Sequence, residues 1–231
     1  MKLQSVYNPI KKCFNVVRNS FRHASECGRN YEQSGAEILA QQNKVLVRPI
    51  NRVEPERVQF DSTKEMFQYA KKKIMFNLNN DFNPREYTVI MNVKDNKVLA
   101  EYIGDSKSCD LSDIESLVLD DKNVVLMHGH PESYPISRAD VRMLLKYKIN
   151  QVIAIDKDGK FSMVARRNDV QSASVDSKEF RLFTEESDAN FEEYLDSQNN
   201  GLLKMMTHYT LNRKSPSLGV RYLTNYPYLK E

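Results

Sequence analysis

The feature that most constrains this 231-residue chain is a short apolar stretch, residues 123–127, that leads directly into His128-Gly129-His130. A short apolar run of this kind is expected of a strand that is buried on both faces. Side chains two residues apart along a strand point to the same side, so His128 and His130 can present two imidazoles to one point. Gly129 between them leaves room for other backbone to approach closely. Because imidazole is the commonest protein ligand for metals such as zinc, the pair predicts a metal site.

A third ligand is available in the helix that is predicted to follow, over residues 137–148. Ser137 is a favourable N-cap, and an apolar stripe runs along the residues after it. Asp140 lies in the first turn, and the six-residue loop 131–136 can fold that turn back beside the strand end. Two histidines and one aspartate leave a fourth position open, as in catalytic zinc sites. Alternatively, Ser137 and Asp140 serve only as helix cap and dipole partner, which leaves the paired histidines unexplained.

Hydrolysis at such a site also requires a general base to take a proton from the attacking water. The candidate is Glu86, at the start of a predicted hairpin, with Glu101 and Glu132 as alternatives. Each of the three can instead be a solvated surface charge. Ser137 can donate a hydrogen bond to a developing oxyanion, although its capping role competes with that.

The elements predicted around the motif alternate helices with hairpins, which indicates an α/β fold of the α+β type or a mixed three-layer arrangement. We expect a basic, partly flexible N-terminal extension over residues 1–55, a domain over 56–170 and a C-terminal extension over 171–231. The C-terminal extension is interpreted as a solvated helix pair, the alternatives being a substrate-gripping surface or an oligomer contact. The predicted elements are a helix beginning at Ser62, strands 87–93 and 98–103, a helix over 110–119, strand 123–127, helix 137–148, and strands 151–155 and 160–165.

The residues His128-x-His130-Pro131, followed by a short loop and Ser137-x-x-Asp140, resemble the JAMM motif of the JAB/MPN metalloproteases, above all in the bacterial RadC-like branch. The likeness covers roughly residues 60–167 and includes Glu86 at the opening of a strand. It implies a cytidine-deaminase-like α/β/α sandwich with one zinc ion per chain. It further implies that His128, His130 and Asp140 bind the metal, that Glu86 activates the water and that Ser137 assists the oxyanion. The typical reaction is hydrolysis of a peptide or isopeptide bond, often by a deubiquitinase that removes ubiquitin or a ubiquitin-like tag.

The chain departs from the family pattern in two places. The loop between His130 and Ser137 is about one residue shorter than usual, and Gly129 stands where Ser, Thr or Asn is more common. Other zinc chemistries fit less well, because no PCxxC follows for a nucleobase deaminase and HExxH is absent. Two further hypotheses stay open: a JAB-fold binding or scaffold protein without turnover, and a RadC-like, DNA-associated protein whose only support is the basic segment 11–29.

The net charge and the cysteines bear on which partners the protein binds and in which cellular compartment it works. With 34 Lys and Arg against 31 Asp and Glu, the net charge is +3, too small to indicate a nucleic-acid-coating protein. The resemblance to the JAB/MPN metalloproteases implies a protein or peptide substrate as the partner. Cys13, Cys27 and Cys109 form no CxxC pair, which favours a reducing compartment. No apolar run approaches the roughly 18 residues of a membrane span. We expect a cytoplasmic protein, and its Asn/Ser/Gln-rich start is compatible with a bacterial effector delivered into a host cell.

Overall fold

The computed structural model describes residues 52–80, 84–106, 108–111, 113–118, 123–132, 134–197 and 200–226. They belong to one compact unit, Pro49–Glu231. Most of the expected N-terminal extension, with the basic segment 11–29, Cys13 and Cys27, lies outside the described residues. Within the described part, no helix combines the length and the apolar character needed to cross a membrane.

A seven-stranded sheet organises the described residues, in the order β1-β3-β2-β4-β5-β6-β7. Neighbouring strands are antiparallel except β4 and β5, which run parallel and are joined through a helix, as parallel strands require. The two predicted hairpins are confirmed as β2–β3 and β5–β6. The strands are β1 (Arg52–Val53), β2 (Tyr87–Asn92), β3 (Lys97–Ile103), β4 (Val124–His130), β5 (Gln151–Asp156), β6 (Phe161–Arg166) and β7 (Val220–Thr224).

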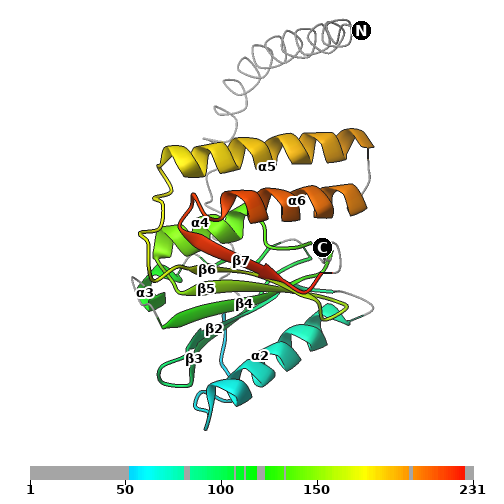
Figure 1. The fold of residues 1–231 in the computed structure, drawn as a ribbon. Coiled ribbons are helices and arrows are strands. Elements are labelled where there is room, and N and C mark those ends of the chain that lie inside the picture. Colours follow the sequence, from blue (N-terminus) through cyan, green and yellow to red (C-terminus); the bar gives the residue numbers. More distant parts are fainter. Residues whose placement is uncertain are drawn as a thin grey trace, which may run out of the picture. The chain divides into compact units, whose positions relative to one another are not determined.

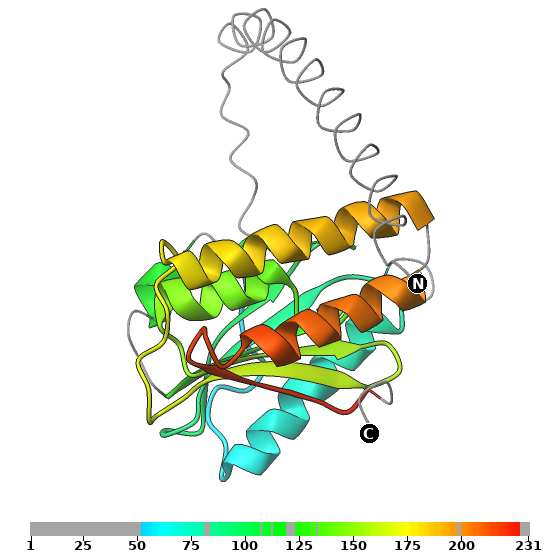
Figure 2. The same cartoon turned by 45° about the horizontal axis from the view of Figure 1, so that its top comes forward.

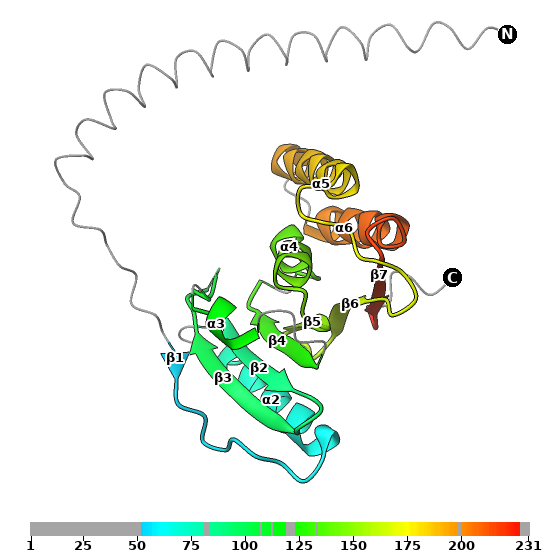
Figure 3. The same cartoon turned by 90° about the vertical axis from the view of Figure 1, so that its left-hand side faces the viewer.

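Helices cover both faces of this sheet, so the expected mixed α/β class is confirmed (Figures 1 and 3). Helix α2 (Thr63–Leu78) packs against β2, β4 and β5 on one face. It begins where predicted, because Ser62 accepts a hydrogen bond from the Glu65 N–H, and it buries an apolar stripe that ends in Ile74 and Leu78. The other face carries α4 (Arg138–Tyr147), α5 (Lys178–Ser197) and α6 (Asn200–Lys214).

Residues beyond 170, expected as an extension, contribute to the same sheet and core. Strand β7 pairs with β6, and α6 lies between the sheet and α5 in the end-on view of Figure 3. Helices α5 and α6 do form a pair, as Figure 2 shows (α5 yellow to orange, α6 orange to red). The pair is not simply solvated, because Phe180, Phe183 and Leu211 from its inner face are buried in the core.

The helix predicted over residues 110–119 is much shorter than expected. Only α3 (Glu115–Val118) is helical, and residues 112 and 119–122 lie outside the described part. Ahead of α3, Ile114 donates its N–H to the Leu111 carbonyl three residues back. That bond closes a turn, whereas a continuing α-helix would bond to the residue four positions back.

Candidate metal centre

The two histidines belong to strand β4, which runs three residues further than the predicted strand. The pleat of β4 directs His128 and His130 to the face covered by α4, together with the buried Leu126. His128 is 4% exposed, and the side chain of His130 is 13% exposed. Gly129 lies on the opposite face, toward α2. The alternation of the strand therefore gives both imidazoles one direction, as the spacing predicts.

Asp140 reaches the histidines because the start of α4 is closed by a reciprocal capping box. Ser137 Oγ accepts from the Asp140 N–H at 3.3 Å, and the Ser137 N–H donates to Asp140 Oδ2 at 2.6 Å. The Ser137 hydroxyl also donates to Oδ2, at 2.7 Å. Asp140 is 3% exposed, so burial and the two hydrogen bonds that Oδ2 accepts from Ser137 fix the position of its carboxylate.

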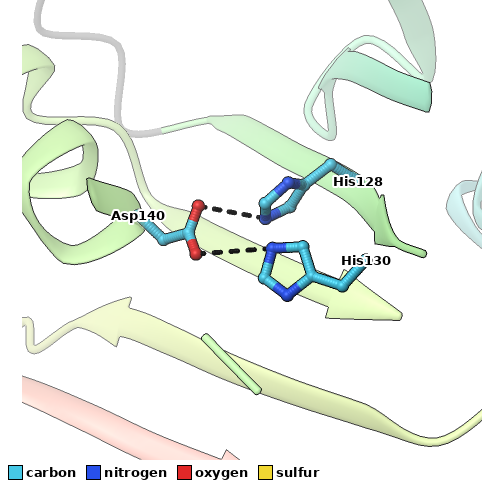
Figure 4. Close-up of side chains that lie close together, drawn as sticks. All are labelled: His128, His130 and Asp140. Atoms are coloured by element: carbon cyan, nitrogen blue, oxygen red, sulfur yellow. Dashed lines mark ion pairs between the residues drawn. The ribbon is translucent and has the colours of Figure 1, made fainter. Parts of the chain in front are cut away.

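Figure 4 shows the three side chains converging on one another. His128 Nε2 lies 3.1 Å from Asp140 Oδ1, and His130 Nε2 lies 3.7 Å from Asp140 Oδ2. One ligand atom from each residue lies within 4.8 Å of the others. His128 Nε2 is buried and has no hydrogen-bond partner, although buried polar atoms normally have one. A buried nitrogen without a hydrogen bond, facing a carboxylate and a second imidazole, belongs to a group that could hold a metal ion.

The far nitrogen of each imidazole is held by an oxygen atom. His130 Nδ1 lies 2.7 Å from the Tyr134 carbonyl, and His128 Nδ1 lies 2.9 Å from Glu86 Oε1. A carbonyl accepts only, so Nδ1 of His130 carries the hydrogen, and its Nε2 is left with a free lone pair. The Glu86 carboxylate likewise accepts the hydrogen on Nδ1 of His128. Such outer partners orient metal-binding histidines and fix their tautomers.

The electrostatics of the group favour a positive charge at its centre. Burial alone would lower the pKa of His128, but the facing carboxylates of Asp140 and Glu86 outweigh burial and raise that pKa to about 10. Burial would raise the pKa of Asp140, yet the two histidines and Ser137 hold it far below its ordinary value. Burial and the neighbouring His128 lower the pKa of His130. A proton on His128 and a metal ion are thus alternative ways to supply the charge.

The structure brings together all five residues singled out from the sequence and excludes one of the alternatives. Glu86, 8% exposed, reaches His128, whereas Glu101 points to the opposite face of the sheet. There Glu101 accepts from the Tyr69 hydroxyl at 2.7 Å and from the Tyr87 hydroxyl. The other alternative, Glu132, is exposed in the loop after β4.

Two contacts of the site were missed by the sequence reasoning. The Tyr134 carbonyl is a backbone group, so no sequence signal identifies it. Ser162 accepts the Ile136 N–H at 2.7 Å from a fully buried position on β6. The sequence did offer a signal for Ser162, which is a polar residue at an inward-facing position of a predicted strand. A buried hydroxyl normally has a hydrogen-bond partner within the structure.

Gly129 is needed for a reason other than the one expected. A Cβ at this position would lie 2.9 Å from Ile74 Cγ2 and 2.9 Å from both Cγ and Cδ2 of Leu78. The close approach is therefore made by side chains of α2, on the face away from the histidines.

Comparisons of this chain with models of protein families, with curated proteins and with solved structures found no match.

Proposed function

We propose that this chain is a zinc-dependent metallo-isopeptidase or peptidase of the JAB/MPN type. The observation that carries the proposal is the convergence of His128 Nε2, His130 Nε2 and the Asp140 carboxylate in one buried group. A sheet with helices on both faces is compatible with the cytidine-deaminase-like sandwich that the JAMM resemblance implies.

Zinc suits this donor set of two imidazoles and one carboxylate. The two nitrogen–oxygen separations, 3.1 Å to Oδ1 and 3.7 Å to Oδ2, involve different oxygens of Asp140. One ligand atom from each of the three residues lies within 4.8 Å of the others, so the three could hold one ion. When bound, zinc supplies a lowered pKa for a coordinated water and polarises a substrate carbonyl.

The remaining chemistry falls to residues of this chain. Glu86 keeps the proposed role of general base, which takes a proton from the attacking water and passes it to the leaving nitrogen. Because Glu86 Oε1 accepts from His128 Nδ1, on the side of the ring away from the ligand nitrogen, this role requires the Glu86 side chain to turn toward the ligand atoms. The Ser137 hydroxyl is engaged by Asp140 Oδ2, so it can serve an oxyanion only by giving up that bond. In the proposed mechanism Ser137 therefore acts mainly by holding Asp140 and only secondarily by stabilising an oxyanion.

The substrate class follows from the resemblance: a peptide or isopeptide bond in a protein, with ubiquitin and ubiquitin-like tags as the first to test. Such substrates are met in a cytosol, that of the producing cell or, for a bacterial effector, that of its host. The DNA-associated alternative rested on the segment 11–29, which lies outside the described residues.

One observation favours a second candidate, a binding or scaffold protein that needs no metal. His128, protonated, would lie between Glu86 Oε1 at 2.9 Å and Asp140 Oδ1 at 3.1 Å. Such an ion-pair network can be stable on its own when the charges in it are paired.

Elemental analysis of the purified full chain distinguishes the two candidates. The enzyme proposal expects about one zinc per chain, loss of that zinc in His130→Ala, and cleavage of di-ubiquitins or peptides that Glu86→Gln abolishes. Zinc without cleavage of any substrate in the panel leaves the metal site standing and puts the substrate class in question. A folded wild-type chain without zinc, even after incubation with the metal, refutes the enzyme proposal and favours the metal-free scaffold.

A further inference from the structure

We propose that Ser162 is a positioning residue for the metal centre: its hydroxyl holds the loop that supports two of the three ligands. This inference rests on the proposed function, because it concerns the affinity of the same site. Ser162 is fully buried on β6, two strands away from His128 along the sheet.

The loop between β4 and α4 supports the ligands at two points. At its middle, the Tyr134 carbonyl accepts from His130 Nδ1 at 2.7 Å and so orients that ring. At its end, the Ser137 N–H and hydroxyl donate to Asp140 Oδ2. Ile136, which lies between these two points, donates its N–H to Ser162 Oγ at 2.7 Å. The Ser162 hydroxyl thus fixes the backbone at a residue flanked by both supporting contacts.

The register of the sheet explains how a residue on β6 can reach this loop. His128 pairs with Ala154 of β5, and Ala154 pairs with Ser162 of β6, so the three side chains form one row. Directly paired residues point to the same face, which here is the face carrying α4. The small side chain of Ala154 leaves space above β5, and the buried Ile136 lies over this part of the sheet.

A hydroxyl at position 162 matters because the Ile136 N–H is shielded from water. Ile136 is 0% exposed, so water cannot replace the serine oxygen as the acceptor for its N–H if that oxygen is removed. The backbone would move to find another acceptor, and both the Tyr134 carbonyl and the Ser137 N–H would move with it. Loss of an outer partner of a metal ligand typically lowers metal affinity 10- to 100-fold. Since Ser162 acts through the loop, we expect about a tenfold loss, at the lower end of that range.

Strand β7 offers a matched control in Thr224, which pairs directly with Ser162. Thr224 Oγ1 also accepts a backbone N–H, that of Tyr226, at 3.1 Å, and it donates to the Phe161 carbonyl. Thr224→Val therefore removes a hydroxyl from the same row, at a half-buried rather than a fully buried position, without touching the metal-binding loop.

The test compares wild type, Ser162→Ala and Thr224→Val as full-length chains. Zinc affinity is measured by competition with a chromophoric chelator, and the ligand geometry by the visible spectrum of the cobalt(II)-loaded protein. We expect both variants to lower the melting temperature of the metal-free chain. Only Ser162→Ala should weaken zinc binding about tenfold and alter the cobalt spectrum, while Thr224→Val stays within about twofold. If Ser162→Ala does not fold, Ser162→Cys, which keeps a weaker acceptor of similar size, should show a smaller loss in the same direction.

The possible failures are distinguishable. Ser162→Ala, or Ser162→Cys in its place, with wild-type zinc affinity and an unchanged cobalt spectrum overturns the role of Ser162 and leaves the proposed function standing. An equal loss of affinity in Thr224→Val also overturns it, because the effect would then be a general consequence of destabilising the sheet. A wild-type chain that binds neither zinc nor cobalt refutes the metal site itself, and the inference with it.

Discussion

Replacing Gly129 with alanine tests whether contact with α2 dictates the residue between the two histidines. Gly129 is not one of the described glycines with positive φ, which are Gly159 and Gly219. Alanine can therefore adopt its backbone conformation, and in free space the substitution would stabilise the chain by about 0.4–1 kcal/mol through the unfolded state. Any destabilisation must come from the side chains packed against the new methyl group.

The structure gives the size of the opposing effect. Carbon atoms pack favourably at about 3.5–4.0 Å, whereas the new Cβ would lie 2.9 Å from atoms of Ile74 and Leu78. Both side chains are buried in the core, at 0% and 4% exposed, so they have little space to withdraw. Overpacking of this kind costs about 1–3 kcal/mol, which exceeds the entropic gain. We expect Gly129→Ala to lower the free energy of unfolding by about 1–2 kcal/mol.

The assay is urea denaturation of the metal-free chain, combined with a double-mutant cycle through Leu78→Ala. Removing the Leu78 side chain clears the contacts to Cγ and Cδ2 but leaves the one to Ile74. In the Leu78→Ala background, Gly129→Ala should therefore cost at least about 1 kcal/mol less than in wild type. Gly201→Ala, at an exposed position of α6, is the control and should be neutral or slightly stabilising. A Gly129→Ala variant as stable as wild type, or a cycle without coupling, would refute the steric explanation.

Three further predictions concern ligand binding, capping and a buried histidine. Zinc at 100 times its Kd should raise the free energy of unfolding by about 2.7 kcal/mol, and Asp140→Asn should remove that gain in thermal melts with and without metal. Ser137→Ala should cost about 1 kcal/mol in urea denaturation by removing the N-cap, whereas Ser137→Thr should retain most of it. Burial lowers the pKa of His208 from 6.5 to about 4. Between pH 6.5 and pH 4, His208 is therefore protonated in the unfolded chain and neutral in the folded chain. Stability should therefore fall by about 2–3 kcal/mol as the pH drops from 6.5 to 4, and His208→Phe should lose that component when denaturation is measured at both pH values.

What the sequence predicts well here is local. The start of α4 follows from Ser137 and Asp140, whose capping box needs only three residues of chain. The common direction of the two histidines follows from the period of a strand. Both features depend on neighbours in the sequence, so neither requires knowledge of the tertiary fold.

What the sequence did not predict depends on contacts between distant segments. The α2 side chains at Gly129 come from more than fifty residues upstream, and the Ser162 hydroxyl meets a loop 26 residues away. Likewise, β7 joins β6 across the whole of α5 and α6. Its first four residues, Val220 to Leu223, alternate between buried and exposed, and Thr224 is half-buried. This alternation identifies a strand but not its partner, which is separated from it by two helices.

Asp140 shows why the helix cap and the metal ligand are one arrangement rather than competing interpretations. Its Oδ2 closes the capping box with Ser137, and its Oδ1 faces His128 Nε2 at 3.1 Å. A cap alone needs one carboxylate oxygen at the helix terminus, and a cap does not require the second oxygen to be buried against two imidazoles. Because the cap already orders the carboxylate, metal binding does not have to supply the entropy of ordering that side chain. The same hydrogen bonds with Ser137 help to keep Asp140 ionised, since they lower its pKa, and an ionised carboxylate is the form that a metal ion binds. The capping box therefore prepares the ligand, and losing Ser137 should weaken metal binding as well as the helix.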